Sequence, residues 1–417
     1  MDLYVSLGRA ACARATIRWE VFIERAGQSL LDVHVLNSPS PLGADRPGLD
    51  GMQTDALFYQ LIGIIAPRIK RLTIESTSGW EHVDSPRNVL TFLLSKCVPG
   101  TLKTLIVDIL ESYYRSGAAS PRFTDKRKLL DLPEDKLESL FNPITILCLR
   151  GYYPKAGSTA YQDLVELHLQ GTISIAESAL VGILKSNRRL RVLHLSSKIT
   201  DSLPENTPIT PVPLDDLRIV KIVPLDDLRI VKIGRSNQRN GNPGTLLRWL
   251  HPGENPLSLT MFRPRVRSNS KNPDLFSKDE TREFLARSKV TKLGLHLVDS
   301  YSQITELLEI APDVQVLVID GIRWGTGEDS LDNGSQHLLD SLYIVPSPLG
   351  FLPELQTVQC LIKMDRIRRL VLWSCMIQHF AKQDELMAED VLDVFYTVCP
   401  VVDIMTKGEP SPVGNWY

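Results

Sequence analysis

The sequence has 417 residues and a formal net charge of −2, and 43% of its residues are hydrophobic and 23% charged. This is an ordinary globular composition, and the near-zero net charge excludes a global basic field that would attract nucleic acid. No stretch approaches the roughly 20 consecutive apolar residues of a membrane-spanning helix, and the first residues lack the apolar segment of a secretory signal peptide. We therefore expect a cytoplasmic or nuclear protein that binds neither membranes nor nucleic acid.

A short phrase returns along the chain: an apolar residue, two variable residues, an apolar residue, one variable residue and an apolar residue. The last two apolar positions are two residues apart, so they point to the same face of a short strand. About ten copies make chance an unlikely origin of the phrase. The copies begin at Leu30, Ile69, Leu102, Ile144, Leu164, Leu190, Val290, Val314, Leu355 and Ile367.

The spacing of the copies predicts the fold class. Leu164 and Leu190 are 26 residues apart, and Val290 and Val314 are 24 residues apart, which is within the range of leucine-rich repeats. Parallel strands need a crossover of a dozen or more residues, usually a helix. We therefore predict an α/β leucine-rich-repeat solenoid over residues 29–407, with parallel strands on the concave side, helices on the convex side and a disordered tail at 408–417.

This fold predicts particular strands and buried residues. Parallel strands are expected at 167–169, 193–195, 293–295, 317–319 and 370–372, in one continuous sheet. Leucines in the repeated phrase should be buried, namely Leu167, Leu169, Leu193 and Leu195.

Several helices carry start and stop signals between the strands. Ser174 and Glu177 have the spacing of a capping box before "SALVGILKS", and Asn187 suits the end of that helix. Pro86 is expected in the first turn of a helix over "RNVLTFLLSK". A further helix is expected near the C-terminus at 381–398.

An exact duplication interrupts the pattern. "VPLDDLRIVKI" occurs at 212–222 and again at 223–233. Eleven residues are too few for a strand and a crossover helix, so the two copies are not successive parallel strands. We expect one copy to form the strand while the other bulges out or folds back.

Motifs for catalysis or cofactor binding are absent from the sequence. There is no phosphate-binding GxxxxGK[ST], no GxGxxG, no HExxH and no GxSxG, and the six cysteines lack the spacing of a zinc site. We expect no enzyme activity, no cofactor and no bound metal, and the cysteines are expected to be buried thiols.

A pair of histidines, His168 and His194, occupies the same position in adjacent repeats. Their side chains should be neighbours about 5 Å apart on the concave face. A metal-binding or pH-sensing pair and plain polar surface both fit this arrangement.

The variable positions of the phrase face away from the core and are the expected contacts of a protein partner. Trp and Arg are enriched in binding hot spots, which singles out Trp373, although loops or the helix at 381–398 could instead cover it. The expected partner-binding residues are Glu166, His168, His194, Lys292, His296, Arg369 and Trp373.

The repeat region resembles fungal F-box-like proteins, as found in expanded sets in mushroom-forming fungi. The resemblance covers about residues 16–405 and is carried by "LFNPITILCLRGYYPKAGSTAYQDLVELHLQG", "LVGILKSNRRLRVLHLSS", "TLLRWLHPGENPLSLTM" and "VFYTVCPVVDIM". It implies a substrate receptor of a cullin–RING ubiquitin ligase that docks on a Skp-type adaptor through an F-box ahead of the repeats.

The N-terminal segment departs from that pattern. "MDLYVSLGRA" resembles the segment that follows an F-box, so residues 1–28 are expected to form a helical lead-in. Two functions remain open: a ligase substrate receptor, which needs an F-box upstream, and a stand-alone repeat protein that binds its partner without a ligase.

Overall fold

The structure is a computed structural model of the chain, which divides into two compact units. Unit 1 contains the described residues up to Leu203, and unit 2 contains those from Pro204 onwards. The structure describes residues 2–6, 21, 23–37, 59–76, 86–109, 129–130, 132–204, 207–222, 243–262, 279–298, 301–322, 338–345, 367–373, 376–379, 384–387, 395–396 and 399–405.

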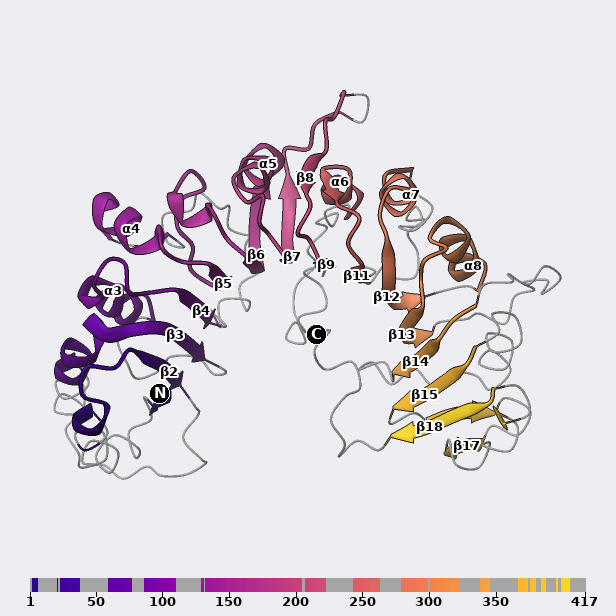
Figure 1. Cartoon of the computed structure of the whole chain (residues 1–417), viewed down its shortest axis with the longest axis horizontal. Coiled ribbons are helices and arrows are strands. Elements are labelled where there is room, and N and C mark those ends of the chain that lie inside the picture. Colours follow the sequence, from indigo (N-terminus) through magenta and orange to yellow (C-terminus); the bar gives the residue numbers. More distant parts are fainter. Residues whose placement is uncertain are drawn as a thin grey trace. The chain divides into compact units, whose positions relative to one another are not determined.

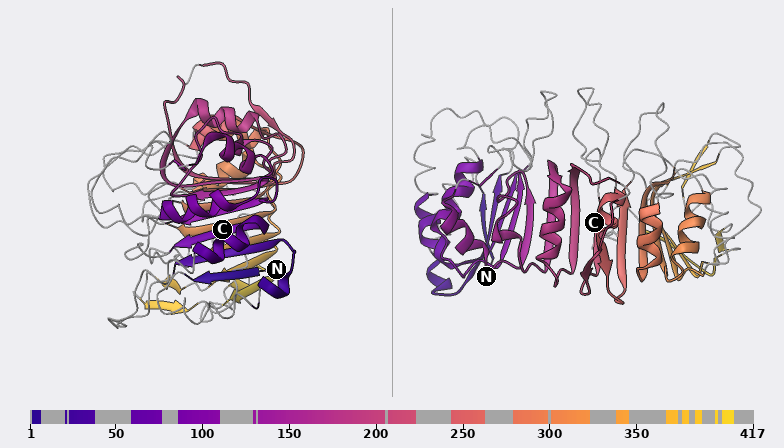
Figure 2. Two further views of the ribbon diagram at one scale, coloured as in Figure 1. Left: turned by 90° about the vertical axis from the view of Figure 1, so that its left-hand side faces the viewer. Right: turned by 90° about the horizontal axis from the view of Figure 1, so that it is seen from above.

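Unit 1 contains a parallel sheet whose strands follow one another in chain order. Within the described residues it has seven strands, and each pairs in parallel with the next one along the chain. Figure 2 shows these strands running side by side. They are β1 (Asp2–Ser6), β2 (Leu31–Asn37), β3 (Ile69–Ser76), β4 (Thr104–Ile109), β5 (Ile146–Arg150), β6 (Glu166–Ala176) and β7 (Val192–Thr200).

Helices connect these strands and cover one face of the sheet (Figure 1). The connections include α3 (Pro86–Lys96), α4 (Glu134–Phe141), α5 (Glu177–Lys185) and the short 3-10 helices η1 (Ala66–Arg68) and η3 (Thr159–Tyr161). Residues 23–26 and 59–65 are also helical. As predicted, Pro86 lies in the first turn of α3, where its missing N–H costs no helical hydrogen bond.

The repeated phrase forms the strands and their core. Leu167 pairs with Leu193, and Leu169 with Leu195. All four are buried as predicted, Leu193 with no exposed surface. The phrase therefore stacks leucines of consecutive strands under the helices, and this burial is the main stabilising contribution expected for the sheet.

Unit 2 repeats the same arrangement. Its described residues contain a parallel sheet in the order β9-β11-β12-β13-β14-β15-β18. The strands are β9 (Ile219–Ile222), β11 (Leu257–Phe262), β12 (Val290–Val298), β13 (Val316–Ile322), β14 (Ser341–Val345), β15 (Arg369–Trp373) and β18 (Val401–Met405). The predicted strands at 293–295, 317–319 and 370–372 are thus parallel members of one sheet.

The remaining elements of unit 2 are helices and two small strand pairs. The helices are α6 (Pro243–Leu247), α7 (Asp279–Ala286) and α8 (Tyr301–Ile310). A parallel pair consists of β8 (Val212–Leu214) and β10 (Leu250–Pro252), and an antiparallel pair of β16 (Met376–His379) and β17 (Asp384–Met387).

Three local predictions are corrected. Residues 2–6 form β1 rather than part of a helical lead-in, because Leu3 is buried and the segment pairs in parallel with β2. Ser174 lies within β6, so it does not cap α5. The helix predicted at 381–398 is wrong for residues 384–387, which form β17.

The first copy of the duplication contributes the expected strand. Within 212–222, residues 219–222 form β9 and pair with β11, while 212–214 form β8 beside β10. The second copy and the predicted tail at 408–417 lie outside the described residues.

Candidate interaction surface on the strand face of unit 1

The strand residues that alternate with the buried leucines point away from the helices. The register aligns these positions in three rows across the seven strands, and we call these rows the strand face; the side chains of Asp2 and Ser6 are outside the described residues. The first row is Asp2, Asp32, Arg71, Thr104, Ile146, Glu166 and Val192. The middle row is Tyr4, His34, Thr73, Ile106, Cys148, His168 and His194. The third row is Ser6, Leu36, Glu75, Asp108, Arg150, Gln170 and Ser196.

Imidazole and aromatic rings gather at both ends of the middle row. The ring centroids of His168 and His194 lie 5.4 Å apart, which confirms the predicted neighbours. At the other end, Tyr4 stacks on His34 with ring centroids 4.6 Å apart, and the Tyr4 residue is 60% exposed. The middle row thus offers flat rings that a partner can contact.

Polar groups around the histidines orient the two rings. The amide nitrogen of Gln170 lies 3.1 Å from Nδ1 of His194, and because an amide nitrogen only donates, Nδ1 is the acceptor. A carboxylate oxygen of Glu166 lies 3.9 Å from Nε2 of His168. Glu166, His168 and His194, all predicted contacts, are therefore brought together on adjacent strands.

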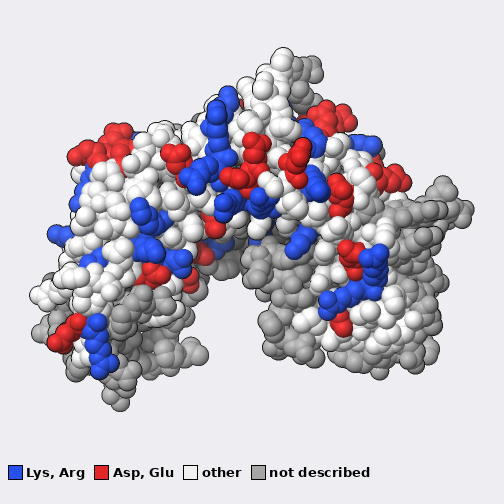
Figure 3. All heavy atoms as spheres, in the orientation of Figure 1, with Lys and Arg blue, Asp and Glu red and all other residues white. Residues whose placement is uncertain are grey.

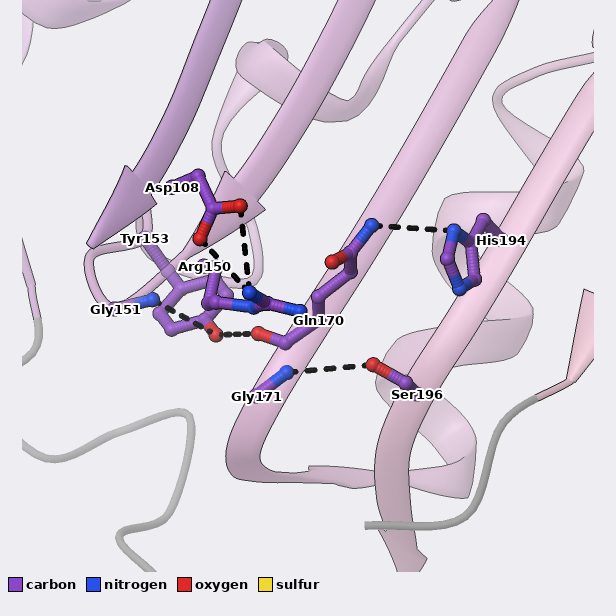
Figure 4. A network of polar contacts seen from close by, with 8 residues as sticks. All are labelled: Asp108, Arg150, Gly151, Tyr153, Gln170, Gly171, His194 and Ser196. Atoms are coloured by element: carbon purple, nitrogen blue, oxygen red, sulfur yellow. Dashed lines mark hydrogen bonds and ion pairs between the residues drawn. The ribbon is translucent and has the colours of Figure 1, made fainter. Parts of the chain in front are cut away.

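An ion pair and a buried tyrosine organise the ends of the strands (Figure 4). Arg150 donates to Asp108 on the neighbouring strand at 2.9 Å. The buried Tyr153 donates its hydroxyl proton to the backbone oxygen of Gln170 and accepts from the backbone N–H of Gly151 at 3.3 Å. The ion pair joins β4 to β5, and the tyrosine joins the end of β5 to β6.

Two glycines make this close approach possible. Gly151 and Gly171 have φ values of +102° and +108°, which side chains rarely adopt. A Cβ on Gly171 would lie 3.1 Å from the Tyr153 hydroxyl, and the Gly171 N–H donates to the Ser196 hydroxyl at 3.4 Å. The turn that follows β5 and the irregular part of β6 between Gln170 and Ser174 therefore depend on glycine.

Asn187 fixes β6 from the core side of unit 1. Its side chain is fully buried. The carbonyl accepts from the backbone N–H of Leu164 at 2.7 Å, and the amide donates to the backbone oxygens of Tyr161 and Ile183, each at 2.6 Å. One side chain thereby connects the end of α5 with the turn before β6.

The Cys148 thiol is held in its neutral form on the strand face. Burial raises its pKa to about 12, and the carboxylates of Glu166 and Asp108 contribute. A thiol with this pKa is a poor nucleophile near neutral pH. Within the described residues, Cys97, Cys148 and Cys399 are free cysteines, and no group of three or more His, Cys, Asp or Glu side chains could hold a metal ion.

The strand face of unit 2 carries the other predicted contacts. Lys292 is exposed on β12, and Arg369 pairs with Asp403 at 2.6 Å. That hydrogen bond raises the pKa of Arg369. His296 and Trp373 lie in β12 and β15, but their side chains are outside the described residues.

One expected outward position of unit 2 is buried. Val371 has 1% exposed surface, because this part of the face is apolar: Val371 pairs with Tyr343, which packs against Val318 and Val345. Polar groups and exposed rings make the strand face of unit 1 the better candidate for binding.

Sequence reasoning missed several strands, two of which follow the repeated phrase, and it missed part of the site. Leu339, Leu342 and Ile344 repeat the phrase and form β14, and Cys399, Val402 and Ile404 do the same at β18. Arg150 directly follows its copy of the phrase, as Gln170 does. This shared position could have identified Arg150 as a residue of the strand face. Tyr153 lies outside the phrase, and no sequence signal points to its role.

Comparison with known proteins adds no family assignment. No protein-family model matches the sequence, and a search of curated proteins returns no match. No helix in the described part of the chain is long and apolar enough to cross a membrane.

Proposed function

We propose that the chain is a non-catalytic leucine-rich-repeat protein that binds a protein partner on the strand face of unit 1. In this proposal each strand with its following helix is one repeat, the strands form the concave side and the helices the convex side. Support comes from the order of the strands in unit 1, since each pairs with its immediate neighbours in sequence, as expected of a solenoid.

The observation that carries the proposal is the set of contacting rings in the middle row, where Tyr4 is exposed and His34, His168 and His194 are partly buried. Tyr4 stacks on His34, and His168 contacts His194. Rigid rings give contact area at low conformational-entropy cost. Neighbouring charged and amide groups, such as Arg150 and Gln170, would supply directional hydrogen bonds at the same surface.

Two roles are compatible with this proposal, and the first is the one that the resemblance to F-box-like proteins implies. A ligase substrate receptor would hold its substrate on the strand face and a Skp-type adaptor elsewhere. A stand-alone repeat protein would hold the same kind of partner without an adaptor. Co-purification of a Skp-type adaptor in stoichiometric amount would favour the first.

The test uses the full chain as bait, with identification and recombinant production of the captured protein. A His168→Ala, His194→Ala double variant should weaken binding of that protein about tenfold or more, since contacts at hot spots are worth at least about 1–2 kcal/mol each. The control is Glu134→Ala on α4, an exposed position away from the strand face.

Trp373→Ala tests whether the partner also contacts unit 2. The Trp373→Ala variant is expected to weaken capture of the partner while leaving the thermal midpoint of unfolding nearly unchanged.

The strand face of unit 1 would be refuted as the binding surface if the histidine double variant folds normally and binds the partner as tightly as the original protein.

A further inference from the structure

Exposed basic side chains gather where the strands of unit 1 begin. Lys70 is the second residue of β3, and Lys103 and Arg191 directly precede β4 and β7. Arg188 and Arg189 lie in the turn between α5 and β7. All five are exposed, and we call them the basic edge. On the face of the molecule that Figure 3 presents, Lys and Arg side chains are interspersed with Asp and Glu side chains.

Backbone hydrogen bonds fix the spacing of the basic edge. Lys103 donates its N–H to the oxygen of Lys70 at 2.8 Å, and the same contact repeats through Thr145 and Val165 to Arg191. These residues therefore occupy one position in five consecutive strands. At about 4.8 Å between strands, Lys70 and Arg191 lie roughly 19 Å apart.

The charges of the basic edge are not neutralised within the protein. In the part of the chain that the structure describes, none of the five forms an ion pair, and the opposing exposed charge in these turns is Asp163. In unit 2, one cation at the corresponding position, Arg368, pairs with Asp340 on the preceding turn at 2.9 Å.

Helix dipoles explain the position of some basic residues at this edge, but not that of Lys70, Lys103 and Arg191. Lys96 and Lys185 lie in the last turns of α3 and α5, where a cation is stabilised by the helix C-terminus. Lys70, Lys103 and Arg191 lie outside helices and gain nothing from this effect. Their alignment calls for a ligand of opposite charge.

We propose that the basic edge binds an acidic segment of a protein in extended conformation. An extended chain advances about 3.3 Å per residue, so about six residues span the roughly 19 Å between Lys70 and Arg191. This inference goes beyond the proposed function and does not rest on it, since it concerns the ends of the strands and not the strand face.

The experiment measures fluorescence anisotropy of labelled oligoglutamate peptides of 2 to 12 residues with the full-length protein. Affinity should rise with length up to about six residues and then level off. Binding should also weaken as salt rises from about 0.05 to 0.5 M, because exposed charges are screened.

Charge reversal locates the site. The double variant Lys103→Glu, Arg191→Glu should lose about tenfold or more in affinity, since two attractive pairs become repulsive. A control is Lys155→Glu: Lys155 is exposed, pairs with Glu134 and follows β5, at the opposite ends of the strands. His168→Ala on the strand face should leave peptide binding unchanged, which separates this test from that of the proposed function.

Several outcomes would overturn the proposal. They are no saturable peptide binding at low salt, an equal loss with Lys155→Glu, or affinity that keeps rising well beyond six residues. Tighter binding of a single-stranded oligonucleotide of equal charge, lost in the same double variant, would assign the basic edge to nucleic acid instead.

Discussion

Replacement of the buried Asn187 by alanine should destabilise unit 1 strongly. The variant leaves the buried N–H of Leu164 without its 2.7 Å acceptor and removes the hydrogen bond to the oxygen of Tyr161. The oxygen of Ile183 still accepts from the backbone N–H of Ser186 at 3.2 Å. Each hydrogen bond contributes about 1 kcal/mol, and a buried group left without its partner costs about 1–3 kcal/mol, so we expect a loss of roughly 3–5 kcal/mol.

Asn142→Ala is the matched control, because Asn142 is exposed at the end of α4 and uses only its backbone N–H, which donates to Glu138. Its effect on the free energy of unfolding should stay within about 0.5 kcal/mol. Urea denaturation followed by circular dichroism measures both variants, and hydrogen exchange should show faster exchange at Leu164 in the Asn187 variant alone. Equal effects of the two substitutions, or a loss below about 1 kcal/mol for Asn187→Ala, would refute the reasoning.

Further predictions concern the core, the turns, the duplication and the thiol. Leu193→Ala should cost about 2–5 kcal/mol in urea denaturation, because it empties a fully buried site. Gly151→Ala should cost about 1–3 kcal/mol more than Gly100→Ala, since both glycines have positive φ but only at Gly151 would a Cβ meet backbone, at 2.8 Å. Deletion of 223–233 should leave cooperative unfolding intact, and its loss would show that both copies are structural. With a pKa of about 12, Cys148 should react with iodoacetamide far more slowly at pH 8 than a free cysteine, and the rate should rise towards pH 11 as the thiolate forms; a rate like that of a free thiol at pH 8 would contradict this.

The sequence predicts the strands well where a copy of the repeated phrase is complete. "LVELHL" and "LRVLHL" place Leu167 and Leu193 in the core and His168 beside His194, as the structure confirms. The alternation of side chains along a strand determines both the burial of the leucines and the exposure of the histidines, since residues next to a buried position lie on the opposite face of the sheet.

Context decides where the sequence interpretation is wrong. Ser174 and Glu177 match a capping box, but β6 continues to Ala176, and the buried Glu177 instead accepts a hydrogen bond from the backbone N–H of Leu203 at 2.6 Å. Val371 follows the outward pattern yet is buried beside Tyr343. Long-range contacts of this kind leave no local periodicity, and so local patterns do not reveal them.

Pairing in chain order has a consequence for how each unit folds. Within the described residues of unit 1, each strand pairs only with the strand before it and the strand after it in sequence. The entropic cost of loop closure rises only slowly with loop length, and contacts limited to neighbouring elements let folding start at one element and propagate. Folding of unit 1 can therefore begin at its best-connected segment, the pair of β6 and β7 with Asn187 beneath it, and extend outward one strand at a time. A destabilising substitution near β1 would then leave the opposite end of the unit able to fold, whereas one in β6 would remove the segment at which folding begins.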